Sequence, residues 1–177
     1  MRPYSRYLDI TQRFALTDGV PDERLYDLIV TNPPFNLHII PTNYDASDRR
    51  WRYGSPPLRN ANFAWLQHVL SALAPAGRAA VLMANGSTFS QHPAERAIRA
   101  AMLDHGVVES MLALPSGLFT WTGVPVTLWL LRNSPAPQRD VLFIDATEFG
   151  KMRNRSQLTL TDEEIEHIVD EYRTWRG

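Results

Sequence analysis

Short apolar runs follow one another along the chain after residue 25, and each is predicted to form a buried strand. The runs have four to eight residues and are bounded by Gly, Pro, Asn or charged residues. The predicted strands are 26–31, 79–84, 107–114, 124–131 and 141–144. No helical pattern separates the third strand from the fourth, so these two strands are expected to be antiparallel neighbours.

Between several of these runs, apolar residues recur at every third or fourth position and predict helices. One helix is expected to begin near Asn62, with Asn60 or Asn62 as its N-cap, and another to begin at Pro93. Thr161 and Glu164 form a capping-box pattern that begins a final helix. Strands that alternate with helices in this order predict an α/β fold, here the C-terminal half of a doubly wound sheet with a final antiparallel strand.

The predicted elements divide the chain into three segments. Residues 1–25 are a polar, partial lead-in, residues 26–134 hold the α/β unit, and residues 135–177 form a C-terminal extension with a short strand and the last helix. Residues 36–60 show neither the apolar periodicity of a helix nor that of a strand, and loops of this length in compact domains are usually functional or disordered. Residues 74–77, Ala-Pro-Ala-Gly, are expected to form the turn that ends the first helix.

The composition is that of an ordinary folded protein, with 44% of the 177 residues apolar and 21% charged. No apolar stretch approaches the ~18 residues of a membrane-spanning helix, and the N-terminus lacks the apolar core of a signal peptide. We therefore expect a cytoplasmic protein that does not contact a membrane. Because the chain has no Cys, disulfides and thiolate metal sites are excluded, and the spacing of its five His residues predicts no metal site.

The charge pattern has one local feature, although the net charge is only −1. Lys151 is the only lysine, and three of the arginines, Arg49, Arg50 and Arg52, surround Trp51. A basic and aromatic patch of this kind can contact nucleic-acid phosphates and stack on bases. It can equally be a solvated loop, and the sequence leaves both readings open.

Asn32-Pro33-Pro34-Phe35 directly follows the first predicted strand and carries the main candidate chemistry. The Asn32 side-chain oxygen and the Pro33 carbonyl can both accept hydrogen bonds, and Pro34 fixes the turn without offering an N–H group. Two acceptors at one strand end suit an exocyclic amine, because holding both of its N–H groups turns the nitrogen lone pair toward an electrophile. Phe35 offers a face for stacking, worth roughly 1–3 kcal/mol per base, and a base in a duplex must first be flipped out.

A strand-ending turn is the simpler reading of Asn-Pro-Pro, since turns favour Asn and Pro. The four-residue motif with its aromatic residue should nevertheless arise by accident in under roughly 1% of chains of this length. Its place directly after an apolar strand makes an accident less frequent still.

The motif resembles the catalytic Asn-Pro-Pro-Phe of amino-methyltransferases that act on adenine N6. The modification (M) subunits of type I restriction-modification systems resemble the chain over nearly all of its length from residue 26. The similar stretches are ANFAWLQHVLSALAPAGRAAVLMANG (61–86), IRAAMLDHGVVESMLALPSGLFTWTGVPVTLWLLRN (98–133), VLFIDA (141–146) and the closing LTDEEIEHIVDEYRTWRG. The resemblance implies a Rossmann-like class I methyltransferase sheet.

The resemblance also implies S-adenosyl-L-methionine as methyl donor, duplex DNA as substrate, and partner specificity and restriction subunits. The methyl group would pass from the sulfonium to N6 in one in-line displacement. Asn32 and Pro33 would hold the amine, with Asn32 also next to the cofactor, Pro34 would shape the corner, and Phe35 would stack on the flipped base. Arg49, Arg50 and Trp51 would contact the DNA.

Two aromatic residues of a later loop have two readings. Phe119 and Trp121 lie between the third and fourth predicted strands, where they could shape the target pocket. Packing roles are the more frequent reading for such side chains.

The sequence departs from this family in the part that holds the cofactor. The family carries a Gly-rich turn upstream of its catalytic motif, whereas the nine glycines here never stand as Gly-x-Gly, and only 31 residues precede Asn32. Asp9 or Asp18 could frame the cofactor adenine, but surface turns are the simpler interpretation of both. We therefore expect the C-terminal portion of a methyltransferase that alone binds the cofactor weakly or not at all.

Two other functions remain open at this stage. The chain could be a non-catalytic interaction piece or relic that needs a separate N-terminal half. It could also be an amino-methyltransferase that acts on RNA or on a protein glutamine.

Overall fold

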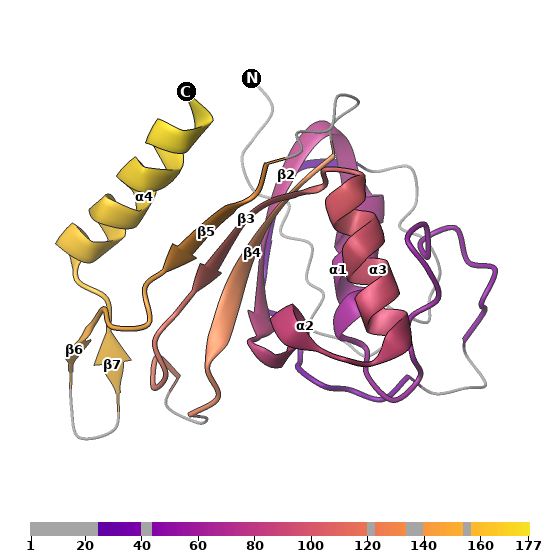
Figure 1. Ribbon diagram of the computed structural model, residues 1–177, viewed down its shortest axis with the longest axis horizontal. Coiled ribbons are helices and arrows are strands. Elements are labelled where there is room, and N and C mark those ends of the chain that lie inside the picture. The colour runs from indigo at the N-terminus through magenta and orange to yellow at the C-terminus, as the bar shows by residue number, and fades with distance from the viewer. Residues whose placement is uncertain (1–24, 40–43, 120–122, 134–139, 154–156) are drawn as a thin grey trace.

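A mixed five-stranded sheet forms the centre of the protein (Figure 1). The computed structural model describes residues 25–39, 44–119, 123–133, 140–153 and 157–177. The strands are β1 (Tyr26–Thr31), β2 (Leu73–Ala84), β3 (Val108–Ala113), β4 (Val126–Arg132) and β5 (Leu142–Asp145), in the spatial order β1-β2-β4-β3-β5. β4 is antiparallel to β2 and β3, and the other four strands are parallel to one another.

The helices lie on both sides of this sheet (Figure 1). They are α1 (Asn62–Ala72), α2 (Gly86–Phe89), α3 (Pro93–Asp104) and α4 (Asp162–Arg176). α1 and α3 cover one face, and α4 lies beside β5, after a small hairpin of β6 (Lys151–Met152) and β7 (Leu158–Thr159). The predicted α/β fold with its antiparallel strand is therefore confirmed.

Alternate residues of the strands enter two separate apolar clusters, as the two-residue period of a strand requires. In β4, Trp129 and Leu131 belong to the first cluster, under α1 and α3, whereas Val126 belongs to the second cluster. The buried members of the second cluster are Leu112, Leu114, Val126, Ile144 and Ala146. The second cluster is covered in part by Ile168 of α4.

α1 is buried on nearly all sides, since only Ser71 of its eleven residues is not buried. The sheet and α3 cover its apolar residues, while residues 44–60 lie against its polar ones. Gln67 accepts a hydrogen bond from the Tyr53 backbone N–H at 2.9 Å and donates one to the Gly54 carbonyl at 2.9 Å. The long loop predicted for residues 36–60 is thus tied to α1 at several points, which are Asn36, Arg50, Tyr53 and Gly54.

A buried carboxylate ties the C-terminal end of α4 to the sheet. Glu109 of β3 is only 2% exposed and lies 3.2 Å from Arg78 Nε and 3.7 Å from Arg176 Nε. The predicted capping box is present at the other end of α4, where Thr161 and Glu164 bond reciprocally.

Two sequence predictions need correction, and some short elements were not predicted at all. Residues 74–77 form no turn after α1 but a bulge within β2, because Tyr26 pairs with Leu73 whereas Leu28 already pairs with Arg78. The N-cap of α1 is Ala61, and no side chain caps this helix. α2 and the β6–β7 hairpin were not predicted, since elements of two to four residues leave no periodic pattern.

Among the described residues, no helix is long and apolar enough to cross a membrane.

Candidate functional site

The parallel strands end at one edge of the sheet, which we call the carboxyl edge. The loops after β1, β2, β3 and β5 all begin there because these four strands point the same way. Open α/β sheets bind ligands outside the carboxyl ends of their strands. The Asn32–Phe35 motif begins at this edge, directly after Thr31, the last residue of β1.

The four motif residues differ in their surroundings. Asn32 and Pro34 are exposed, Pro33 is buried, and Phe35 is half-buried against the second cluster. Among the hydrogen bonds of the described residues, none uses the Asn32 carboxamide or the Pro33 carbonyl oxygen. Pro33 thus anchors a corner on which the Asn32 acceptor is open to a ligand.

The residue after the motif is held by a buried asparagine from α1. Asn36 has a positive φ of 54°, and its backbone N–H donates to Asn62 Oδ1 at 3.0 Å. Asn62 Nδ2 in turn donates to Asn36 Oδ1, also at 3.0 Å. Asn62 is 2% exposed whereas Asn36 is exposed, so these two bonds are partly buried.

Polar side chains also meet where β2 ends. Asn85 Oδ1 accepts a hydrogen bond from Thr127 Oγ1 at 2.8 Å, which joins the loop after β2 to the start of β4. Phe89, at the end of α2, is 62% exposed. Sequence reasoning missed Asn36, Asn62 and Asn85 as site residues. The available signal was a polar amide placed at the edge of an apolar run, as in Asn62-Phe63-Ala64.

Of the predicted DNA-contacting residues, Arg50 and Trp51 have partners inside the protein. Arg50 is 4% exposed, its guanidinium binds the Asp48 carboxylate at 2.5 Å, and its Nη1 lies 3.2 Å from His68 Nδ1. Trp51 is 9% exposed and its indole N–H donates to the Asp45 carbonyl at 2.9 Å. DNA contact by these two residues stays a prediction, whereas Arg49 and Arg52 are exposed.

The Arg50 network fixes the protonation of its histidine. Burial, reinforced by the positive charge of Arg50, lowers the pKa of His68 to about 4. Because an arginine only donates, Nδ1 of His68 accepts and the ring proton sits on Nε2. Burial alone would raise the pKa of Asp48, but the hydrogen bonds and charge of Arg50 outweigh burial and lower it.

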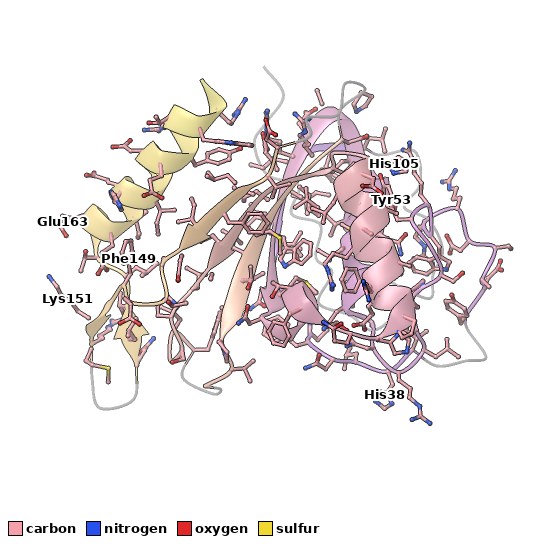
Figure 2. The ribbon with its side chains drawn as sticks, viewed as in Figure 1. His38, Tyr53, His105, Phe149, Lys151 and Glu163 are labelled. Carbon is pink, nitrogen blue, oxygen red and sulfur yellow. The ribbon has the colours of Figure 1, made fainter. Side chains whose placement is uncertain are left out.

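A cavity of about 440 Å³ lies beside this loop but far from the Asn32 corner. Arg49, Arg52 and Tyr53 line it, together with Leu73 at the amino end of β2. Figure 2 shows the same separation, with Tyr53 near the top of α3 and His38, which follows the motif, at the bottom of the molecule. The cavity is therefore not part of the carboxyl-edge site.

The remaining predicted site residues are placed only in part. Asp9, Asp18 and Trp121 lie outside the described residues. Phe119 is half-buried and packs against the second cluster, as the packing interpretation predicted. No group of three His, Asp or Glu side chains suited to a metal ion occurs among the described residues.

The described residues provide only part of a binding site for a methyl-donor cofactor. The exposed Asn32 carboxamide at the carboxyl edge can face both an amine and a donor. The chain has no Gly-x-Gly sequence with which its own backbone could cradle the far end of such a molecule. The described residues therefore fit the target-base side of the site and not the cradle.

Comparison with known proteins places the chain in a family. Residues 8–177 match the family model described as N-6 DNA Methylase. The HindI methylase subunit, a type I restriction enzyme component of Haemophilus influenzae, is 42% identical over 154 residues, covering 87% of this chain and 35% of the relative. The MjaIX methylase subunit of Methanocaldococcus jannaschii is 37% identical over 164 residues, covering 86% of this chain and 28% of that protein.

Solved structures agree with these relatives. The type I restriction-modification methyltransferase subunit of Streptococcus thermophilus superposes with a TM-score of 0.77 at 29% identity, covering 86% of this chain and 32% of the other. A Listeria monocytogenes structure described as a class I S-adenosylmethionine-dependent methyltransferase, at 14% identity and a TM-score of 0.57, shows likeness of fold alone. The chain spans about a third of the length of the relatives it matches. It belongs to the N-6 DNA methylase family and is homologous to part of the methylase subunits of type I restriction-modification systems.

Proposed function

We propose that the chain forms the target-adenine side of a DNA adenine-N6 methyltransferase of a type I restriction-modification system. The observation that carries the proposal is the Asn32 corner, an exposed acceptor with no hydrogen-bond partner among the described residues, at the carboxyl end of β1. Family membership supports the reaction class, and the exposure of Asn32 supports its proposed task as an acceptor.

Each motif residue has a distinct task in this proposal. Asn32 Oδ1 and the Pro33 carbonyl oxygen accept the two N–H groups of the adenine amine, which turns its lone pair toward the methyl donor. The buried Pro33 keeps the corner rigid, and Pro34 brings no competing N–H group. Phe35 stacks on the flipped base while its other face remains on the second cluster.

S-adenosyl-L-methionine, when bound, supplies an electrophilic methyl group. Asn32 would lie next to it, and Asp18 is the further candidate for its adenine end. The rest of its site would come from sequence equivalent to the part of the relatives that this chain does not span. We expect the isolated chain to be inactive for this reason.

DNA, the specificity subunit and the restriction subunit are the proposed partners. The exposed Arg49 and Arg52 line the cavity away from the Asn32 corner, so the phosphates that they would neutralise lie away from the target base, at a slope of about −0.9 in log affinity against log salt for each contact. Recognition of the DNA sequence would belong to the specificity subunit in this proposal.

The test is methyl transfer to DNA by this chain mixed with the N-terminal part of a relative such as the HindI methylase subunit. Asn32→Ala should lower kcat by at least about a hundredfold, whereas Gln91→Ala, an exposed carboxamide in the loop after β2, should not. Equal activity of Asn32→Ala and Gln91→Ala would remove Asn32 from the mechanism. Transfer to RNA or to a protein glutamine, with none to DNA, would identify a different substrate.

A second candidate function, an interaction piece that completes a separate N-terminal half, is favoured by the outer surface of β1. β1 is the edge strand of the described sheet, and its Leu28 and Val30 are 63% and 65% exposed. Such an edge readily pairs with another strand. Under this reading, Val30→Lys abolishes binding of the N-terminal half while Asn32→Ala leaves that binding intact.

A further inference from the structure

We infer that Asn62 is a positioning residue for the catalytic corner, acting through a two-bond amide pair with Asn36. The inference rests on the proposed function, because it assigns a task to the residue that holds the end of the Asn32–Phe35 motif. Neither Asn36 nor Asn62 touches the reacting atoms in this account. Their pairing sets where Asn32 stands relative to α1 and the sheet.

The pair has one orientation only. The backbone N–H of Asn36 can only donate, so the atom of Asn62 that faces it must be Oδ1. Nδ2 of Asn62 is then the atom that faces Asn36 Oδ1, at 3.0 Å. The backbone N–H of Asn36 therefore fixes the orientation of the Asn62 amide, and both Oδ1 and Nδ2 of Asn62 have a hydrogen-bond partner.

The side chain of Asn62 bonds outside its own helix. Asn62 is the first helical residue of α1, and the N-cap before it is Ala61, whose side chain has no polar atom with which to cap the helix. The carboxamide of Asn62 reaches to a residue 26 positions earlier in the chain. This amide therefore fixes the chain that leaves the motif rather than the start of α1.

Two backbone hydrogen bonds next to the amide pair also join the chain after the motif to the residues before α1. Ala61 N–H donates to the Leu37 carbonyl at 2.8 Å, and Ile39 N–H donates to the Leu58 carbonyl at 2.7 Å. Asn60 Oδ1 accepts the Asn62 N–H at 3.0 Å and so steadies the residue that holds Asn36. The chain that leaves the motif is therefore fixed along its next four residues.

The corner is held on both sides as a result. β1 fixes it before Asn32 through pairing of Thr31 with Val81, and the amide pair fixes it after Phe35. Asn36 needs a left-handed backbone conformation, with φ at 54°, to turn the chain from the motif toward α1. A misplacement of about 1 Å in such a catalytic group can lower the rate about a hundredfold.

A double-mutant cycle with aspartate tests the pair. Asn36→Asp keeps both bonds, because its carboxylate still accepts from Asn62 Nδ2. Asn62→Asp also keeps both, because its carboxylate accepts the Asn36 N–H while the Asn36 amide turns over and donates. The double variant N36D/N62D sets two carboxylates against each other, so it alone loses the side-chain bond.

Amide hydrogen exchange and nitrogen-15 relaxation of the 177-residue chain measure the effect of the pair on the backbone, and they do not require an active enzyme. We expect exchange of the Asn36 amide, and disorder of the Asn32 and Phe35 amides, to change less than about threefold in either single variant. In the double variant, exchange should be at least about tenfold faster than the product of the two single effects. Additive effects of the two substitutions would overturn the inference.

Asn36→Gly covers the case in which the double variant fails to fold. Glycine accepts a φ of 54° without strain, so this variant removes only the side-chain bond. Faster exchange at residue 36 with an unchanged unfolding midpoint supports the pair, and wild-type exchange contradicts it.

Methyl transfer in the mixture with a relative's N-terminal part separates this inference from the proposed function. If Asn62 positions the corner, N36D/N62D lowers kcat at least about tenfold more than the product of the single variants, with KM for DNA changed additively. If the two single substitutions have additive effects on kcat, the positioning role is overturned, even if hydrogen exchange shows that the amide pair exists. An unaffected Asn32→Ala would instead overturn the proposed function, and leave the exchange result as the measure of the pair.

Discussion

His68 makes the stability of the protein depend on pH below neutrality. Its side chain is buried next to Arg50, and the pKa of His68 is about 4, against an ordinary value near 6.5. Between these two values the unfolded chain binds more protons at this position than the folded chain does. The stability that His68 contributes is therefore complete above about pH 6.5 and is lost as the pH falls toward 4.

The size of the effect follows from the same two values. The difference between 6.5 and about 4, at 1.36 kcal/mol for each tenfold step, is worth about 3 kcal/mol of unfolding free energy. That is a large share of the roughly 5–15 kcal/mol of a typical domain. The loss arises mainly because burial disfavours the charged imidazole, and in addition because a proton on Nδ1 would face the Arg50 guanidinium, which is 3.2 Å away.

The assay is urea unfolding of the wild type and His68→Asn between pH 7 and pH 4. Asparagine keeps an acceptor for Arg50 but takes up no proton, so the wild type should lose about 3 kcal/mol more than the variant over this range. The same substitution at exposed His92 controls for the removal of an imidazole. Equal losses in the wild type and His68→Asn would refute the reasoning.

Two further predictions concern the packing of the sheet. Glu109→Gln removes the charge that pairs with Arg78 and Arg176. It should lower the unfolding free energy by about 1–3 kcal/mol and speed amide exchange in the last turn of α4. Unchanged amide exchange in that turn would show that Glu109 does not hold α4 on the sheet. Gly77→Ala would bring a Cβ to 2.7 Å from the Tyr26 carbonyl oxygen, so thermal unfolding should show a loss of about 1–3 kcal/mol, whereas Gly86→Ala, with no atom within 4 Å, should be close to neutral. Equal midpoints for the two alanine variants would contradict the close approach of β1 and β2.

The strand that leads into the Asn32–Phe35 motif was predictable because its boundaries are local. β1 ends where its sequence meets two prolines, and its predicted and observed bounds agree. The start of β2 was not predictable, since Pro75 and Gly77 have the composition of a turn. Pairing of Leu73 with Tyr26, a tertiary contact, draws these residues into a bulged strand.

The Asn32–Phe35 motif could be identified from the sequence as a candidate site, whereas the residues that hold it in place could not. Asn32 to Phe35 stand out in the sequence because two prolines and an aromatic residue follow an apolar strand. Helical periodicity predicted only one apolar face for α1, yet the structure buries its polar residues too, because the loop before the helix packs on them. Which distant group a buried Asn62 or His68 binds depends on how that loop returns to the helix, and a single sequence does not carry this information.

The central claim is that Asn32 and Pro33 hold the amine of a flipped adenine. It is tested most directly by a crystal structure of the chain, completed by a relative's N-terminal part, with target DNA and a donor analogue that lacks a transferable methyl group. We predict the adenine N6 at about 2.7–3.2 Å from both Asn32 Oδ1 and the Pro33 carbonyl oxygen, with the base stacked on Phe35. A flipped base bound elsewhere, with Asn32 still open to solvent, would contradict the account.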